Sequence, residues 1–353
     1  MNSNAKKIKV AMVAPPFGST GGPEVVVHNL TEALLKKGID VTLFAPADWK
    51  TRAKHISTLK KSLWNMKDFS KQDEFTRRNY IISSQIKVLA YQDEFDIIHL
   101  HSQRYAYCVA ANLKKPCVVS FHNKVLLCQY NQLKESKTKM VVLSNSQKGE
   151  FRVDSVINNG VPVSDIEPSF KKGKYLIVIG RIDDQKGIDI AIKIAKKSGK
   201  KLLIFGRKGD SEKRKKYFNE KVKPHINGKN IIYKGQISNK RLYKYIRGAE
   251  ALLFTIRRPE VFGLVVAEAL ACGTPVIGTN INPLPEILKN KKVAYLSNDI
   301  NKLIEVAENT ERFDRVECRK YAEKYFDSSV MADKYIKLYR KIIDNKNINK
   351  KLL

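Results

Sequence analysis

Two glutamates in an otherwise apolar stretch have a spacing that suggests chemistry. They are Glu260 and Glu268, in the segment PEVFGLVVAEALACGTPVIG from Pro259 to Gly278. A carboxylate accepts hydrogen bonds from hydroxyl groups, and each bond stabilises more where apolar side chains exclude water. The pair therefore suits a ligand that carries several hydroxyl groups.

The local pattern places these acids at the carboxyl end of a strand. A strand is expected over 251–256, and a helix is expected to open at Phe262 and to end at Cys272. Glu260 then lies in the loop just ahead of the free backbone amides of the helix. Glu268 lies inside the helix, on the face turned toward the ligand.

Two cations follow another expected strand, 175–181. Arg181 and Lys186 lie five residues apart in GRIDDQKG. Two cations in such a loop can converge on a diphosphate and neutralise charge on a departing group. The alternative is ordinary surface charge in a lysine-rich chain, which fits Lys186 better than Arg181, the residue at the strand end itself.

A glycine-rich turn follows the first expected strand. In PPFGSTGGPEVVV, Gly18, Gly21 and Gly22 lead directly into a helix, so the backbone can approach a ligand and the helix N-terminus can hold a phosphate. The turn has neither the spacing of a dinucleotide-binding fingerprint nor the lysine of a Walker loop. An ordinary turn is therefore the alternative.

His99 and His101 end a further expected strand, 96–101. Residues two apart in a strand share one face of the sheet. A histidine at this edge can act as a general base or as a hydrogen-bond donor. A metal pair is the competing idea, but no third ligand with suitable spacing is visible.

The elements that would position these residues alternate between short β-branched runs and amphipathic segments, as in a parallel sheet covered by helices. The pattern runs once through residues 1–165 and restarts in 166–327, with the boundary at about 163–173. The sequence therefore predicts an α/β protein of two doubly wound, Rossmann-like domains. Strands are expected at 7–14, 40–46, 96–101, 117–122, 139–144, 155–158, 175–181, 201–206, 230–235, 251–256, 274–279 and 292–297.

Three further segments carry expectations. A helix at 23–38 is closed by Gly38, and a helix at 328–345 has an apolar stripe that must pack on elements already formed, with a polar tail at 346–353. Within 49–93, the basic stretch KTRAKHISTLKKSLWNMKDF is expected to be a helix. That helix either covers the sheet or binds a membrane surface or an acceptor.

The charge of the chain is unusual. Lys and Arg number 66 against 35 Asp and Glu, a net charge of +31, which attracts nucleic acid, acidic phospholipid or a phosphate-bearing substrate. The alternative is compositional drift with dispersed lysines. Five cysteines without a C-x-x-C pair predict neither a disulfide framework nor a zinc site, and the N-terminal apolar run is too short for a signal peptide. We therefore expect a cytoplasmic protein, with the inner face of the membrane as the place of any peripheral association.

Taken together, these motifs resemble the retaining glycosyltransferases of the two-domain GT-B fold, in particular glycosyltransferase family four, or group 1. The family pattern E-x-F-G-x-x-x-x-E-A-x-A-x-G-x-P-V-I matches without a gap at Glu260, Phe262, Gly263, Glu268, Ala269, Ala271, Gly273, Pro275, Val276 and Ile277. Its other signatures match at Gly180, Arg181, Lys186 and Gly187, at Asn159, Gly160 and Val161, at Gly21 and Gly22, and at His99 and His101.

The resemblance implies two Rossmann-like domains facing a cleft, with the C-terminal helix crossing back to the N-terminal domain. It implies transfer of a hexose from a nucleotide diphosphate sugar, UDP- or GDP-linked, to an unidentified hydroxyl acceptor, without a cofactor or a metal. In this family Glu268 would hold the ribose hydroxyls and Glu260 a hydroxyl of the donor hexose. The remaining roles implied are sugar or diphosphate contacts from Phe262, Gly263, Leu264, Gly21 and Gly22, stabilisation of the leaving group by Arg181 and Lys186, and a place beside the reacting sugar for His101.

Other functions remain open at this point. A nucleotide-sugar epimerase or a sugar phosphorylase can use a related cleft, and a basic chain on this scaffold is also compatible with binding to a membrane surface. Nucleic-acid binding is disfavoured because no groove rich in aromatic and basic residues and no recognition helix is visible. Arg257 and Arg258 stand where many relatives have Ser and Gly, so we expect them to influence the choice of sugar.

Overall fold

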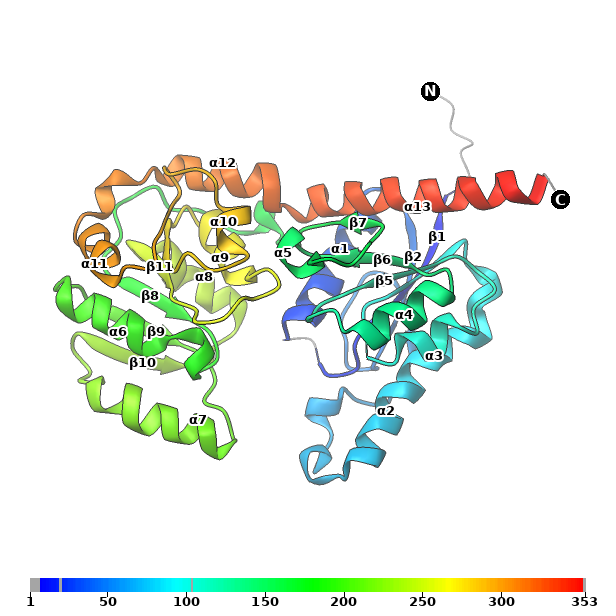
Figure 1. Cartoon of the computed structure of the whole chain (residues 1–353), viewed down its shortest axis with the longest axis horizontal. Coiled ribbons are helices and arrows are strands. Elements are labelled where there is room, and N and C mark those ends of the chain that lie inside the picture. Colours follow the sequence, from blue (N-terminus) through cyan, green and yellow to red (C-terminus); the bar gives the residue numbers. More distant parts are fainter. Residues whose placement is uncertain (1–6, 19–20, 103, 352–353) are drawn as a thin grey trace. The chain divides into compact units, whose positions relative to one another are not determined.

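The computed structural model describes residues 7–18, 21–102 and 104–351. The chain forms two compact units. The second is Val161–Asp327, and the first consists of the chain up to Gly160 together with the chain from Ser328 onward. Each unit is a parallel β-sheet with helices packed on it (Figure 1), so the predicted α/β class with two doubly wound domains is confirmed.

The first unit has seven strands in the order β3-β2-β1-β4-β5-β6-β7. Their bounds are β1 (Lys9–Val13), β2 (Asp40–Ala45), β3 (Lys54–Ser57), β4 (Ile97–Leu100), β5 (Cys117–Ser120), β6 (Lys139–Val142) and β7 (Ser155–Val156). The central strands are buried almost throughout, as expected for a parallel sheet covered on both faces. This burial explains why they appear in the sequence as continuous apolar runs.

Helices of the first unit are α1 (Gly22–Lys36), α2 (Glu74–Ile86), α3 (Ala106–Ala110), α4 (Leu127–Glu135), α5 (Asn145–Lys148) and α13 (Ser328–Lys351). After α1, Gly38 has a φ of 80°, which fits its expected role of ending the helix. Helix α13 packs against α1, and its apolar stripe buries Met331, Tyr335 and Tyr339.

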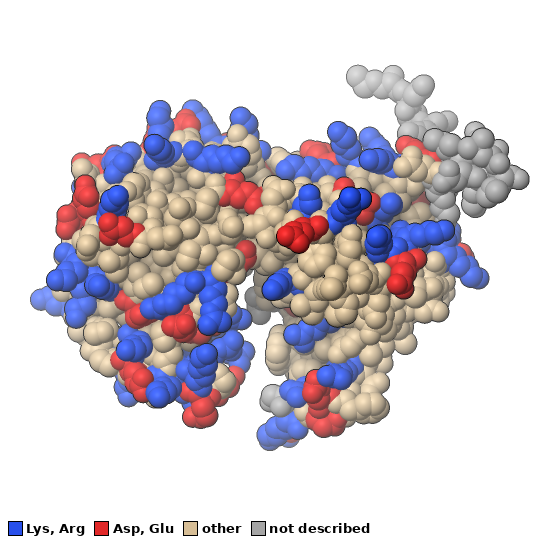
Figure 2. Space-filling model, in the orientation of Figure 1, with Lys and Arg blue, Asp and Glu red and all other residues tan. Residues whose placement is uncertain are grey.

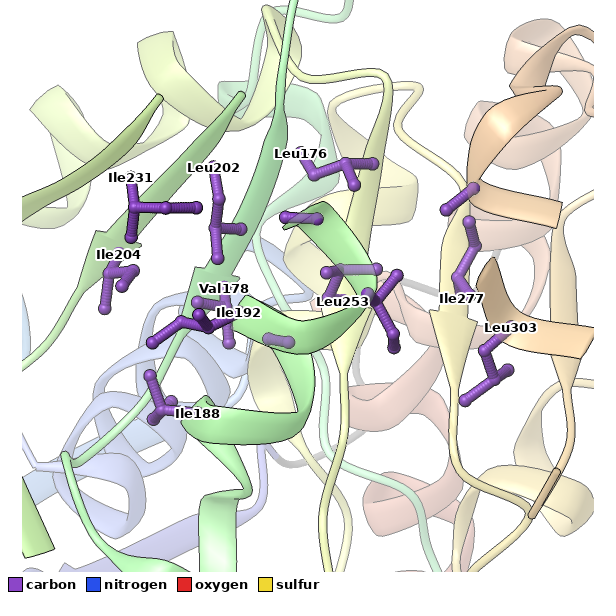
Figure 3. Packing of buried hydrophobic residues seen from close by; sticks show 14 of the residues in the cluster. Leu176, Val178, Ile188, Ile192, Leu202, Ile204, Ile231, Leu253, Ile277 and Leu303 are labelled. Atoms are coloured by element: carbon purple, nitrogen blue, oxygen red, sulfur yellow. The ribbon is translucent and has the colours of Figure 1, made fainter. Parts of the chain in front are cut away.

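The second unit has six strands in the order β10-β9-β8-β11-β12-β13. They are β8 (Leu176–Ile179), β9 (Leu202–Phe205), β10 (Ile231–Gly235), β11 (Ala251–Phe254), β12 (Val276–Gly278) and β13 (Ala294–Leu296). The helices are α6 (Ile188–Lys197), α7 (Glu212–Tyr217), α8 (Asn239–Arg247), α9 (Leu264–Ala271), α10 (Leu284–Ile287), α11 (Ile300–Glu308) and α12 (Arg315–Phe326). Figure 3 shows the core, in which side chains of these strands interdigitate with Ile188 and Ile192 of α6 and Leu303 of α11.

Both sheets reverse their strand order next to their first strand. In the first sheet β1 lies between β2 and β4, and in the second sheet β8 lies between β9 and β11. Ligands of doubly wound folds bind at the carboxyl ends of the strands at such a reversal. The glycine turn and His101 follow β1 and β4, whereas Arg181 and Glu260 follow β8 and β11. The predicted site residues therefore lie at the two reversal points.

The prediction of a helix at KTRAKHISTLKKSLWNMKDF, within 49–93, is wrong. The stretch forms the edge strand β3 and two 3₁₀ turns, η1 (Leu63–Asn65) and η2 (Phe69–Lys71), before α2 begins. The hydroxyl of Ser62 donates a hydrogen bond to the carboxylate of Asp48 at 2.6 Å, and the amide of Leu63 donates to the carbonyl of Pro16 at 2.9 Å. These bonds to β-sheet loops replace the hydrogen bonds that a helix would have made.

Basic side chains are spread widely. Figure 2 shows Lys and Arg scattered across the face in view, with Asp and Glu among them. Within the described residues, no helix is both long enough and apolar enough to cross a bilayer. All five cysteines are free.

Candidate active site

Lys186 and Glu260 meet beside the carboxyl ends of β8 and β11. Their side chains form an ion pair and are only 18% and 13% exposed. The neighbouring Gly187 has a φ of 59°, and a Cβ there would lie 1.9 Å from the carbonyl oxygen of Thr255. Only glycine therefore lets this loop approach the end of β11 closely enough for the pair to form.

Arg181 lies at the start of the same loop and is 55% exposed. Its Nε donates to Oδ2 of Asp183 at 3.1 Å. Asp183 is buried and also accepts a hydrogen bond from the backbone amide of Lys186, at 3.2 Å from Oδ1. The loop is thus ordered around Asp183 and presents two cations, of which Arg181 is open to an anionic ligand.

Glu268 is buried in α9. One of its carboxylate oxygens accepts a hydrogen bond from the hydroxyl of Tyr243, on α8, at 3.3 Å. Burial raises the pKa of the Glu268 carboxyl to about 7, and the hydrogen bond from Tyr243 offsets only part of that rise. A carboxyl group that ionises near neutrality in apolar surroundings is well suited to bind hydroxyl groups of a ligand.

The helix that carries Glu268 starts at Leu264, two residues later than expected, because Gly263 has a φ of 87° that a helix cannot contain. The backbone amides of Phe262, Gly263 and Leu264 donate no hydrogen bond to any described residue. They are available to a ligand. The ring of Phe262 is buried and packs edge-on against Phe326, with centroids 5.6 Å apart, so it belongs to the core.

Arg257 has a structural contact that the sequence did not indicate. Its two terminal nitrogens bind the carboxylate of Asp189, at 2.8 and 2.5 Å, and one of them donates to the carbonyl of Asp184 at 3.0 Å. Its own amide donates to the carbonyl of Gln185 at 2.8 Å. Arg257 therefore clamps the loop after β11 to the loop after β8. Arg258 has no such partner among the described residues.

In the first unit, His101 follows β4 and His122 follows β5. Nδ1 of His101 lies 2.9 Å from Nε2 of His122, so one nitrogen donates and the other accepts. The ring of His101 also lies on that of His99, with centroids 3.9 Å apart, which confirms that both face the same side of the sheet. His99 is in turn held by the hydroxyls of Ser120 and Tyr339, at 2.8 and 2.6 Å.

These three histidines are neutral at pH 7. Burial lowers the pKa values of His99 and His101 well below the ordinary value, and it lowers the pKa of His122 to about 4. Nε2 of His101 is buried and has no hydrogen-bond partner among the described residues. His101 is thus a neutral imidazole with one unused nitrogen at the edge where a ligand would bind.

The glycine turn of the first unit leads into α1 as expected, although its residues 19 and 20 lie outside the described part of the chain. Gly21 is the residue that caps α1, and Gly22 is the first residue of the helix. A Cβ on Gly21 would lie 2.0 Å from the carboxylate of Glu24, whose pKa burial raises to about 7. Across the same edge, the amide group of Gln85 donates to the carbonyl of Ala14 at 3.0 Å.

Two family models match this chain. Glycosyltransferase Family 4 matches residues 20–164, and Glycosyl transferases group 1 matches residues 163–325. The chain is a group 1 glycosyltransferase. The two matches together run from residue 20 to residue 325, and the two Rossmann-like domains match the fold of GT-B glycosyltransferase structures.

This glycosyltransferase is similar to known proteins in sequence and in fold. An uncharacterised 41.2 kDa protein in the cps region of Klebsiella pneumoniae is 28% identical over 91% of this chain and 96% of its own. AviGT4, a glycosyltransferase involved in avilamycin A biosynthesis, has the same fold, with a TM-score of 0.71 and 21% identity over 96% of this chain and 98% of its own. The fold also matches Anabaena HepE in complex with UDP and glucose, with a TM-score of 0.73 and 15% identity over 95% of this chain and all of HepE.

Several contacts in the glycosyltransferase were not foreseen. Tyr243, which holds Glu268, lies in the lysine- and arginine-rich helix α8 and carries no motif. His122 ends an expected strand beside His101, and that position was the one available signal for it. Nothing in the sequence pointed to Gln85 or to Asp189, the partner of Arg257. Among the described residues, no cluster of three or more potential ligand side chains is arranged to hold a metal ion.

Proposed function

We propose that this glycosyltransferase moves a hexose from a UDP- or GDP-linked sugar to a hydroxyl group of an acceptor, with retention of configuration at the anomeric carbon. The observation that carries the proposal is the ion pair of Lys186 with Glu260. It brings a cation suited to a diphosphate and a carboxylate suited to sugar hydroxyls to the same point, beside unused backbone amides. The complex of HepE with UDP and glucose supports UDP as one donor nucleotide.

In this proposal Glu268 binds the ribose hydroxyls and Glu260 binds a hydroxyl of the hexose. Arg181 and Lys186 stabilise the departing diphosphate, assisted by the amides of the Phe262–Leu264 segment. Negative charge grows on the diphosphate as the glycosidic bond breaks, so fixed cations lower the barrier more than they stabilise the bound substrate. No cofactor or metal is required for this chemistry.

The first unit supplies the remaining groups in our proposal. His101 would lie beside the reacting hexose, and the amides at Gly21 and Gly22 would approach the diphosphate. Retention without a protein nucleophile fits a front-face reaction, in which the leaving phosphate helps to deprotonate the acceptor hydroxyl. Catalysis is then mainly a matter of position and electrostatics.

Thermal stabilisation tests the donor assignment. UDP-, GDP- and ADP-linked hexoses and the free nucleotides would be added in turn to the wild-type protein and to Glu268→Ala. A rise in melting temperature with one nucleotide class, lost in the variant, is expected. The absence of a shift with every donor would contradict the proposal. Formation of free hexose from the donor without acceptor, with no sugar phosphate formed when phosphate is added, would separate transfer from phosphorolysis.

A second proposal concerns the membrane, and it rests on a surface of the first unit. Trp64 is 60% exposed and Phe75 is 77% exposed, in the same stretch of chain as Lys60, Lys61 and Lys67, which have no ion-pair partner among the described residues. Aromatic rings and lysines together favour the interface of an anionic bilayer. We infer peripheral binding there, which would suit a lipid-linked acceptor at the inner face of the membrane.

Liposome flotation tests this second proposal. Vesicles with anionic lipid should carry the protein at low salt and release most of it at high salt, because salt screens the lysines. Trp64→Ala with Phe75→Ala should lower flotation, whereas Tyr325→Ala, an exposed aromatic on α12, should leave it unchanged. Equal flotation of all three proteins would contradict the proposal.

A further inference from the structure

A cavity of about 600 Å³ lies within the second unit, between α7 and the loops after β8 and β11. Asp184 and Gln185 of one loop and Arg258 of the other line it, together with Lys213 and Tyr217 of α7. None of the four charged residues proposed to bind the donor lines the cavity, but it borders the candidate active site, because Asp183 and Gln185 of the loop that carries Arg181 and Lys186 line it. Its volume is in the range of small-molecule sites.

The lining of this cavity is cationic. Five cations, Lys213, Arg214, Lys216, Lys221 and Arg258, face three acids, Asp183, Asp184 and Glu220. Arg214 lies 3.7 Å from Asp183, and Lys216 lies 4.0 Å from Glu220. Within the described part of the chain, Lys213, Lys221 and Arg258 have no ion-pair partner. A small anion with two or more negative charges fits this surplus of cations.

One chain of contacts joins the cavity wall to the candidate active site. The hydroxyl of Tyr217 donates to Oδ1 of Asp189 at 2.5 Å, and the Asp189 carboxylate holds Arg257. Arg257 in turn holds the backbone at Asp184 and Gln185, immediately before Lys186. The helix that carries Tyr217 continues into a π-helical turn, Phe218–Val222, a rare conformation that recurs at functional sites.

A second connection is more direct. Asp183 accepts from Arg181 at 3.1 Å and lies 3.7 Å from Nε of Arg214. Arg181 belongs to the candidate active site, and Arg214 belongs to the cavity. An anion bound in the cavity competes with Asp183 for the guanidinium of Arg214. Asp183 then interacts less with Arg214 and binds Arg181 more strongly. The diphosphate of a donor must then compete with Asp183 for Arg181.

We propose that this cavity binds a small phosphorylated molecule as an effector, and that its occupancy weakens donor binding. The coupling depends on the proposed function for the identity of the donor, whereas the existence of the anion site does not. Repulsion between the effector and the donor diphosphate acts in the same direction. Linkage requires that a bound donor weakens the binding of the effector by the same factor.

Calorimetric titration of the full chain with inorganic phosphate tests the site itself. Arg181→Ala with Lys186→Ala removes the donor cations and is expected to keep phosphate binding. Lys213→Ala with Lys221→Ala removes two cavity cations and is expected to weaken it about three- to tenfold. The control Lys196→Ala with Lys197→Ala removes the same charge from exposed positions at the end of α6 and is expected to bind like the wild type.

The coupling is tested by the Kd of UDP or GDP, with and without saturating phosphate. Phosphate should raise that Kd about fivefold or more in the wild type and much less in the cavity variant. Tyr217→Phe should bind phosphate normally and show a smaller coupling, because it lacks the hydroxyl that contacts Asp189. An undiminished effect in the cavity variant would mean simple competition at the donor site and would overturn the coupling.

Two further outcomes separate this inference from the proposed function. If the donor-cation variant binds no phosphate, the cavity is not an anion site and the inference fails. If phosphate binds to the cavity but neither UDP nor GDP binds to the wild type, the anion site stands while the donor assignment and the coupling fail.

Discussion

Lys186 and Glu260, which lie 74 residues apart in the chain, form a largely buried ion pair between the loops after β8 and β11. The pair holds both side chains in place before a ligand arrives. Each partner also offsets part of the cost of burying the other charge. In our proposal, a nucleotide sugar takes the place of one partner of this ion pair.

Glu260→Gln tests this pair, since it preserves the shape of the side chain and removes its charge. We expect the rate of transfer to fall about 100-fold or more, the usual effect of losing one electrostatic contact in a transition state. The free energy of unfolding should fall by only about 1–2 kcal/mol, because Lys186 retains some access to water. Initial rates and urea denaturation of the same preparation measure both quantities.

The matched control is Asp210→Asn, which breaks the exposed Arg207–Asp210 pair of the same unit. It should change neither quantity appreciably. Transfer by Glu260→Gln within about threefold of the wild-type rate would remove Glu260 from the candidate site.

We predict that Glu268 makes donor binding depend on pH. Its pKa is raised to about 7, so the carboxylate proposed to accept hydrogen bonds from the ribose hydroxyls is lost as the pH falls through 7. The affinity for the donor nucleotide should fall by at most roughly tenfold per pH unit below that value. Calorimetry between pH 6 and 8.5 measures the effect, and Glu268→Gln should bind weakly with little pH dependence. A wild-type affinity that is constant over this range would contradict the assignment.

The same carboxyl group affects stability in the opposite sense. Between pH 4.5 and 7 the unfolded chain releases the proton of Glu268 while the folded protein keeps it, so the free energy of unfolding falls as the pH rises. The total cost is at most roughly 3 kcal/mol. Glu268→Gln should therefore gain stability relative to the wild type when the pH is raised from 5 to 8, and denaturation at both pH values shows this.

Arg257 and Arg258 are adjacent in sequence but should differ in their effects. Arg257→Ala removes the clamp on Asp189 and should lower the free energy of unfolding by about 1–3 kcal/mol, with a weaker affinity for the donor, because the loop of Lys186 loses its support. Arg258→Ala serves as the matched control and should leave stability within about 0.5 kcal/mol of the wild type. Equal stability of the two variants would show that the clamp does not support the loop.

The sequence predicted the sheets well because their strands are buried on both faces and therefore appear as continuous apolar runs. The missed strand β3 is an edge strand in which Ile56 is the only apolar residue. Backbone hydrogen bonds to the neighbouring strand β2 hold β3 in the sheet, and amino-acid composition does not reveal such bonds. The conformation of the next segment depends on hydrogen bonds from Ser62 and Leu63 to other loops.

The candidate site was predictable to the extent that each residue follows a strand or belongs to a motif. The pairings within it were not predictable. Whether Lys186 meets Glu260 depends on how closely two loops approach, and the approach depends on the missing side chain of Gly187. Tyr243 reaches Glu268 from a helix whose sequence shows only lysines, arginines and a buried stripe.

The contact of His101 with His122 leads to the last prediction. His122→Phe should lower the rate of transfer, because Nδ1 of His101 loses its partner and the imidazole is no longer fixed in position and tautomer. His122→Gln can still offer an amide hydrogen to that nitrogen. If His122 acts as the donor, the glutamine variant should recover most of the rate, with kcat affected more than KM in the phenylalanine variant.

Stability provides an independent measure of the same contact. Below pH 6.5 His122 takes up a proton in the unfolded chain, whereas in the folded protein it stays neutral down to about pH 4. The free energy of unfolding should therefore fall in the wild type as the pH drops from 7 toward 4, by up to roughly 3 kcal/mol from this residue. The difference in stability between the wild type and His122→Gln should shift by that amount across the range. A constant difference, together with full activity of His122→Phe, would show that His122 does not position His101.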